Sequence, residues 1–150
     1  MSAETQAKKY IFLADDDADD RMLFEDALKE APMQTELISA GDGVQLLNLL
    51  KKENAPQPEV IFLDLNMPRK NGFECLDEIR KTPSLKNIPV VIFSTTAQLE
   101  EVNKAYEKGA NRYICKPGSF SLLSKAIQAV LAINWEGNTT PLTRENFLLQ

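Results

Sequence analysis

The sequence has no histidine among its 150 residues and only two cysteines, Cys75 and Cys115. The missing imidazole excludes histidine-based catalysis, histidine metal ligands and storage of a phosphoryl group on histidine within these residues. Both cysteines fall inside apolar segments, so we expect two buried core thiols and no disulfide framework.

Long apolar runs and an excess of basic residues are also missing. No run approaches the ~20 apolar residues that span a bilayer, and the opening MSAETQAKK lacks a signal-peptide core. We therefore expect a cytoplasmic protein without a membrane partner. With 17 basic and 22 acidic residues, the net charge is −5, which argues against nucleic-acid binding. The composition, 43% hydrophobic and 26% charged, is typical of one globular domain.

The sequence does contain a regular alternation of short apolar runs and longer stretches at helical spacing. The predicted strands are residues 10–14, 35–40, 59–64, 88–94 and 111–116. Five strands alternating with five helices predict an α/β fold with a doubly wound five-stranded parallel sheet. No glycine-rich turn follows the first strand, so a dinucleotide-binding fold is set aside.

Reactive side chains follow four of the predicted strands. Asp15 and Asp16 follow the first strand, Asp64 ends the third, Ser94 ends the fourth and Lys116 ends the fifth. The carboxyl ends of parallel strands share one edge of a sheet, where functional groups gather. Clustered carboxylates repel one another unless a cation neutralises them, and hard oxygen ligands favour Mg²⁺. A neighbouring hydroxyl and ammonium group would suit a phosphoryl group.

Each of these residues also has a simpler interpretation. Asp17, Asp19 and Asp20 are expected to cap the first helix or to lie in its first turn. Taken alone, Asp64 could begin a turn and Lys116 could be an ordinary solvated lysine. Their joint arrangement at the strand ends favours one shared site.

Four segments together resemble the receiver domain of bacterial response regulators. They are DDD (15–17), FLDLNMPRKNG (62–72), PVVIFSTTA (89–97) and GANRYICKP (109–117). The resemblance covers about residues 8–133 and implies a flavodoxin-like (βα)5 receiver fold. Residues 1–7 are then an N-terminal tail, and residues 134–150 are a C-terminal tail without a separate output domain.

The resemblance implies roles for the acidic residues. Asp64 resembles the phosphoacceptor and is also a Mg²⁺ ligand. Asp16 resembles the direct metal ligand, and Asp15 its neighbour that acts through a metal-bound water. Asn66 resembles the position whose backbone carbonyl completes the protein ligands.

It also implies a phosphoryl-binding switch. Ser94 resembles the hydroxyl that meets the phosphoryl group, Thr95 follows it, and Lys116 resembles the lysine that pairs with that group. Tyr113 resembles an aromatic residue that swings inward after phosphorylation. Two positions are structural in the family: the turn at Gly72, and a cis peptide bond that usually precedes the proline, here Pro117.

The implied function is that of a response regulator. It accepts a phosphoryl group from a partner histidine kinase or histidine phosphotransfer protein and presents a changed surface to an unknown downstream protein. It would be no enzyme beyond its own phosphorylation and dephosphorylation. The stretch of residues 82–96 resembles stand-alone regulators that work with phytochrome-type kinases, and several of those regulators form homodimers.

Two other functions compete with this interpretation. A receiver-like interaction module that is never phosphorylated would share the fold, although all the reactive residues are present here. A haloacid-dehalogenase-like phosphatase needs a second acid two residues after its nucleophile, where this sequence has Asn66. Asn66 has no proton to donate, so the sequence disfavours the phosphatase.

Overall fold

A computed structural model describes residues 8–135 and 143–149, so the predicted tail of residues 1–7 lies outside the described residues. Six parallel strands form one sheet in the order β2-β1-β3-β4-β5-β6. The strands are β1 (Lys9–Ala14), β2 (Thr35–Ala40), β3 (Pro58–Leu63), β4 (Val90–Ser94), β5 (Arg112–Cys115) and β6 (Leu148–Leu149). The helices are α1 (Ala18–Leu28), α2 (Gly43–Lys51), α3 (Gly72–Lys81), α4 (Leu99–Glu107), α5 (Phe120–Leu131) and α6 (Arg144–Phe147).

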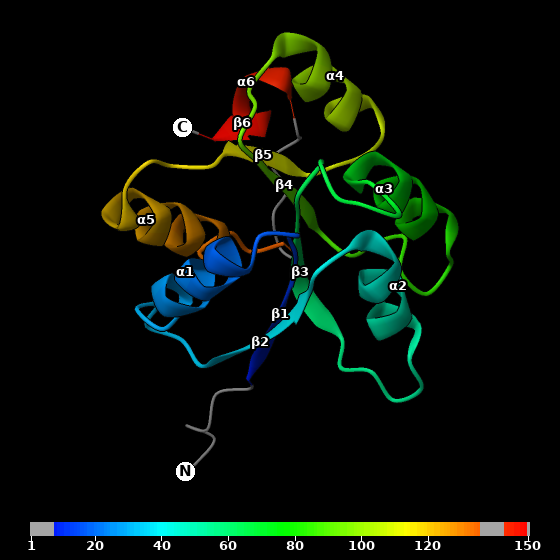
Figure 1. Cartoon of the computed structure of the whole chain (residues 1–150), viewed down its shortest axis with the longest axis horizontal. Helices are drawn as coiled ribbons and strands as arrows, with labels where there is room; N and C mark the ends of the chain where they lie inside the picture. The colour runs from blue at the N-terminus through cyan, green and yellow to red at the C-terminus, as the bar shows by residue number, and fades with distance from the viewer. Residues whose placement is uncertain (1–7, 136–142, 150) are drawn as a thin grey trace.

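Helices cover both faces of the sheet, with α1 and α5 on one side and α2, α3 and α4 on the other (Figure 1). The predicted doubly wound parallel α/β fold is confirmed, and the structure adds β6 to the five expected strands. The described residues contain no helix that has both the length and the apolar character needed to span a membrane.

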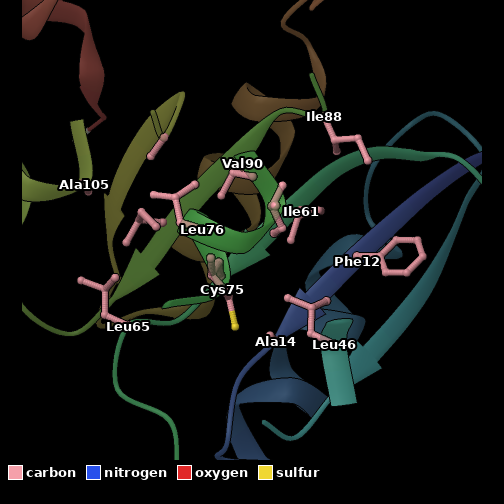
Figure 2. Packing of buried hydrophobic residues seen from close by; sticks show 14 of the residues in the cluster. Phe12, Ala14, Leu46, Ile61, Leu65, Cys75, Leu76, Ile88, Val90 and Ala105 are labelled. Carbon is pink, nitrogen blue, oxygen red and sulfur yellow. The ribbon is translucent and has the colours of Figure 1, made fainter. Parts of the chain in front are cut away.

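The uninterrupted apolar runs of the central strands follow from this double cover. In β1, Ile11 and Leu13 pack with Phe24 of α1 on one face of the sheet. Phe12 and Ala14, between them in sequence, pack on the opposite face, and Figure 2 shows both on that side of β1. Because successive side chains of a strand alternate between faces, a strand covered on both sides needs apolar residues at every position.

The cap of α1 fixes the segment that follows β1. Asp17 is the N-cap, and its carboxylate accepts hydrogen bonds from the backbone N–H groups of Asp19 (2.8 Å) and Asp20 (3.1 Å). These bonds satisfy donors that the first helical turn leaves without partners. The predicted capping role of these residues is confirmed, and it sets α1 directly beside the end of β1.

Residues 143–149 of the predicted C-terminal tail pack onto the domain. Leu148 and Leu149 pair in parallel with Tyr113 and Ile114 of β5. Phe147 is fully buried, with ring centroids 5.2 Å from Tyr106 and 6.3 Å from Tyr113. A two-residue strand is too short to leave a periodic signal in the sequence, so pattern reasoning could not find β6.

The two cysteines differ in their surroundings. Cys75 is fully buried, as expected, and burial raises the pKa of its thiol to about 12. Cys115 is exposed, so its assignment as a core thiol was wrong. Cys115 is the last residue of β5, where the strand passes beyond the buried part of the sheet.

Candidate functional site

The four strand ends named by the sequence meet along one edge of the sheet. Asp15 comes directly after β1, Asp64 after β3 and Lys116 after β5. Ser94 is the last residue of β4. These four strands are consecutive neighbours in the sheet. Residues that are far apart in sequence are therefore placed side by side, as expected where parallel strands end.

Three carboxylates form the centre of this edge. Asp15, Asp16 and Asp64 each offer a carboxylate oxygen, and these oxygens lie within 4.8 Å of one another. Asp15 is fully buried and Asp64 is 5% exposed, whereas Asp16 is open to solvent. The ligand set is made only of hard oxygen atoms, which suits Mg²⁺ or Mn²⁺, and the exposed side leaves space for metal-bound water. The residues present therefore fit a divalent ion of this kind.

Sheet hydrogen bonds hold the two buried carboxylates in place. The backbone N–H of Asp15 donates to the carbonyl of Ala40 at 3.1 Å, and that of Asp64 donates to the carbonyl of Ala14 at 3.0 Å. In addition, the Arg21 guanidinium donates to the Asp15 carbonyl at 2.6 Å. The carboxylates are thus attached to the rigid sheet and not to a free loop.

Lys116 neutralises part of this negative charge. Its ammonium nitrogen lies 2.8 Å from a carboxylate oxygen of Asp15, 2.9 Å from one of Asp20 and 3.4 Å from one of Asp64. The Lys116 side chain is only 12% exposed. Its backbone N–H also donates to the carbonyl of Ser94 at 2.7 Å, which ties the end of β5 to the end of β4.

The surroundings shift the proton affinities of both groups in the same direction. Burial raises the pKa of Asp64, the Lys116 ammonium opposes this rise, and the neighbouring Asp15 charge adds to it. For Lys116, burial lowers the pKa, but hydrogen bonds to Asp15 and Asp20 and the Asp64 charge outweigh burial and raise it. Lys116 therefore stays positively charged at neutral pH, next to a carboxylate that is costly to ionise.

The loop after Asp64 runs against the backbone of the first turn of α3. The N–H of Gly72 donates to the Leu65 carbonyl at 2.9 Å, and a β-carbon added to Gly72 would lie 2.3 Å from the Asp64 carbonyl oxygen. Only glycine fits this approach. The exposed Asn66 donates its backbone N–H to the Asp64 carboxylate at 3.3 Å.

The hydroxyl residues at the end of β4 connect the site to Tyr113. Ser94 is fully buried and its hydroxyl oxygen accepts the Thr96 N–H at 3.4 Å, while Thr95 is exposed. The Tyr113 hydroxyl donates to the Thr96 carbonyl at 2.6 Å. Tyr113 is itself fully buried, which is the inward position expected from the sequence after phosphorylation. The ring of Phe147 packs on the Tyr113 ring in this position.

The expected cis bond before Pro117 was also wrong. The residues described contain no cis peptide bond, so Lys116 and Pro117 are joined in the trans form. Trans is the intrinsically favoured form of such bonds by roughly 0.5–1 kcal/mol.

Sequence reasoning missed one contact of the site. Asp20 was expected only in the first turn of α1, yet its carboxylate accepts a hydrogen bond from Lys116 at 2.9 Å. No local signal in the sequence could have found it, because Asp20 and Lys116 are 96 residues apart.

Comparison with known proteins agrees with this geometry. Residues 11–128 match the response regulator receiver domain family, and the chain belongs to this family. It is therefore a receiver domain of two-component signalling, a class that implies a kinase partner.

Among its relatives is the response regulator Rcp1 of Synechocystis sp., which is 37% identical over 145 residues, covering 94% of this chain and 99% of Rcp1. Two solved structures show a similar fold. A phosphorylated cyanobacterial phytochrome response regulator, RcpA, superposes with a TM-score of 0.79 at 34% identity, covering 89% of this chain and 98% of RcpA. The Mn²⁺-bound form of Rcp1 superposes with a TM-score of 0.76 at 36% identity, covering 89% of this chain and 99% of that one.

Proposed function

We propose that this chain accepts a phosphoryl group on Asp64 from a partner histidine kinase or histidine phosphotransfer protein. The observation that carries this proposal is that one largely buried lysine, Lys116, contacts both Asp64 and Asp15 beside a three-carboxylate cluster. Such an arrangement offers a nucleophile, a cation that balances developing charge and oxygen ligands for a metal. RcpA is a phytochrome response regulator by name, which supports a phytochrome-type kinase as donor for this chain. We place the reaction in the cytoplasm as part of the same proposal.

In the proposed reaction, a carboxylate oxygen of Asp64 forms a bond to phosphorus while the bond from phosphorus to the donor imidazole breaks. The leaving imidazole takes up a proton, and Asp64 becomes an aspartyl phosphate. Lys116 keeps its ammonium charge beside the transferred group, and the buried surroundings strengthen that interaction. The chain changes only itself in this reaction and turns over no separate substrate.

The metal in this proposal is Mg²⁺. Asp16, Asp64 and the backbone carbonyl of Asn66 would hold it directly, and Asp15 would hold it through water. When bound, it supplies neutralising charge for the anionic donor and the acidic site. The protein contributes the fixed positions of the ligands, through the strand ends and the close approach of Gly72 to Asp64.

The proposed switch uses the link from Ser94 through Thr96 to Tyr113. A phosphoryl group on Asp64 would draw the Ser94 hydroxyl toward its oxygens, with Thr95 at the mouth of the site. Since Tyr113 is already buried, phosphorylation would then stabilise the present inward packing against alternatives. The surface formed by α4, β5 and α5 is the proposed contact for a downstream protein. A homodimer also stays a prediction.

The test is the isosteric change Asp64→Asn with a small phosphodonor. Wild-type protein incubated with acetyl phosphate and Mg²⁺ should gain about 80 Da, one phosphoryl group, and chelation of the metal should prevent the gain. Asp64→Asn should gain nothing. Asp26→Asn, the same change at an exposed position of α1, should be labelled like wild type.

Labelling of Asp64→Asn to the wild-type extent would refute the assignment of the phosphoacceptor. One observation favours a second function, an interaction module that is never phosphorylated: the ring of Phe147 packs on Tyr113 and holds it in its inward position. Wild-type protein that stays unlabelled by both acetyl phosphate and phytochrome-type kinases would favour that function.

A further inference from the structure

Lys116 has a third carboxylate partner that none of the roles above uses. Asp20, in the first turn of α1, lies 2.9 Å from the Lys116 ammonium, closer than Asp64 at 3.4 Å. An ammonium group has three N–H donors. Asp20 and Asp64 each accept a hydrogen bond from the Lys116 ammonium, and Asp15 forms an ion pair with it at 2.8 Å.

The charge and the contacts of these three carboxylates change differently during the proposed reaction. Asp64 loses its carboxylate charge when an oxygen is bonded to phosphorus, and Asp15 lies in the carboxylate cluster that fits a metal. Asp20 is outside that cluster, so neither event takes its charge away from Lys116. Asp20 is the partner of Lys116 that neither is phosphorylated nor belongs to the cluster that fits a metal.

We propose that Asp20 is a positioning residue for phosphoryl transfer: it anchors the Lys116 ammonium from the α1 side, so that Lys116 stays directed at Asp64. This inference rests on the proposed function of Asp64. Asp20 acts through Lys116 in this proposal and does not contact the phosphoryl donor.

The structure gives Asp20 the rigidity that an anchor needs. Its backbone N–H is fixed by the Asp17 cap at 3.1 Å, and α1 is held to the sheet by the fully buried Phe24. Lys116, by contrast, lies in the segment between β5 and α5 and depends on side-chain contacts for its direction. An ion pair to a fixed helix restricts the four rotatable side-chain bonds of Lys116 before the reaction begins. The entropy cost of directing the ammonium at Asp64 is then lower during the transfer.

A pure charge effect would give a different result from positioning. Removing a negative charge near the site helps an anionic donor to bind, so it lowers the half-saturating donor concentration. Losing the anchor instead lowers the rate constant at saturating donor, because Lys116 then spends less time beside the reacting group. The two effects separate in a titration with acetyl phosphate.

The experiment compares Asp20→Ala, Asp20→Asn and Asp20→Glu with Asp19→Ala in the full chain with Mg²⁺. Asp19 lies beside Asp20 in the same helical turn, carries the same charge and is exposed. We expect Asp20→Ala to lower the saturating rate constant about tenfold, the scale of one charge-assisted hydrogen bond, without raising the half-saturating donor concentration. The saturating rate constant of Asp20→Asn should lie between those of Asp20→Ala and wild type. Asp20→Glu should recover most of the wild-type rate constant, and Asp19→Ala should match wild type.

A second readout needs neither metal nor donor. A buried, hydrogen-bonded ammonium exchanges its protons slowly, so Lys116 should give a ¹H–¹⁵N signal in metal-free wild type and in Asp19→Ala. That signal should disappear or shift in Asp20→Ala, whose fold is checked by circular dichroism. Asp20→Asn, which has the same shape as wild type, provides the comparison if Asp20→Ala fails to fold.

The proposal is overturned if the Asp20 variants keep the saturating rate of Asp19→Ala. It is also overturned if the rate falls while the Lys116 signal is unchanged, or if Asp20→Glu is as slow as Asp20→Ala. Failure of the proposed function itself looks different, because wild-type protein would then take up no phosphoryl group at all.

Discussion

Gly72 offers a direct test of how the fold positions Asp64. A β-carbon at this position would lie 2.3 Å from the Asp64 carbonyl oxygen and 2.8 Å from the Leu65 α-carbon. Both are backbone atoms, so no side chain can rotate away to make room. Gly72→Ala must instead displace the loop that follows Asp64.

The expected cost has two parts. Inserting a methyl group into a closely packed position costs about 1–3 kcal/mol. Opening the loop also weakens the 2.9 Å hydrogen bond from the Gly72 N–H to the Leu65 carbonyl, for about 1 kcal/mol more. We expect a total loss of roughly 2–4 kcal/mol, and a midpoint of thermal unfolding lowered by about 5–15 °C for a chain of this size.

Urea denaturation followed by circular dichroism measures this loss. The matched control is Gly118→Ala, because a β-carbon at Gly118 meets nothing within 4 Å. The control should change the free energy of unfolding by less than about 0.5 kcal/mol. Folded Gly72→Ala should also take up phosphoryl groups more slowly than Gly118→Ala, since Asp64 is displaced. Equal stabilities of the two variants would show that the loop does not approach α3 as closely as described.

Two other predictions concern Tyr113 and its surroundings. Phe147→Ala should lower the free energy of unfolding, measured in urea, by up to about 3 kcal/mol, because a fully buried ring is lost. The control Leu99→Ala, at a side chain that is 67% exposed, should cost less than about 0.5 kcal/mol. Equal losses in the two variants would mean that residues 143–149 do not dock on the domain. Burial raises the Tyr113 pKa from 10.0 to about 12, so its contribution to stability is complete below pH 10.0 and is lost as the pH rises toward about 12. Between mildly and strongly alkaline pH, the urea midpoint of unfolding should therefore fall further for wild type than for Tyr113→Phe. An equal fall of the midpoint in both proteins would contradict a buried hydroxyl.

Local patterns carried the fold and the positions of the reactive groups. Apolar runs separated by helical spacing predict a parallel sheet covered on both faces, because a strand buried on both sides needs apolar residues at every position. The strand ends at Asp15, Asp64 and Lys116 then had to share one edge, since parallel strands all point the same way. The Asp17 cap was predictable because it is a local feature: its carboxylate accepts hydrogen bonds from residues only two and three positions ahead in the sequence.

Contacts between distant segments were decided by the tertiary structure alone. The pairing of Lys116 with Asp20 joins residues 96 apart in sequence, and its geometry depends on how α1 packs against the end of β5. The inward position of Tyr113 depends on Phe147, which reaches it through a strand too short to leave a pattern. The sequence by itself determined which chemical groups stand at the edge of the sheet, because strands that alternate with helices along the chain lie parallel. Which groups touch was left to packing, because a contact between remote segments has no period to read.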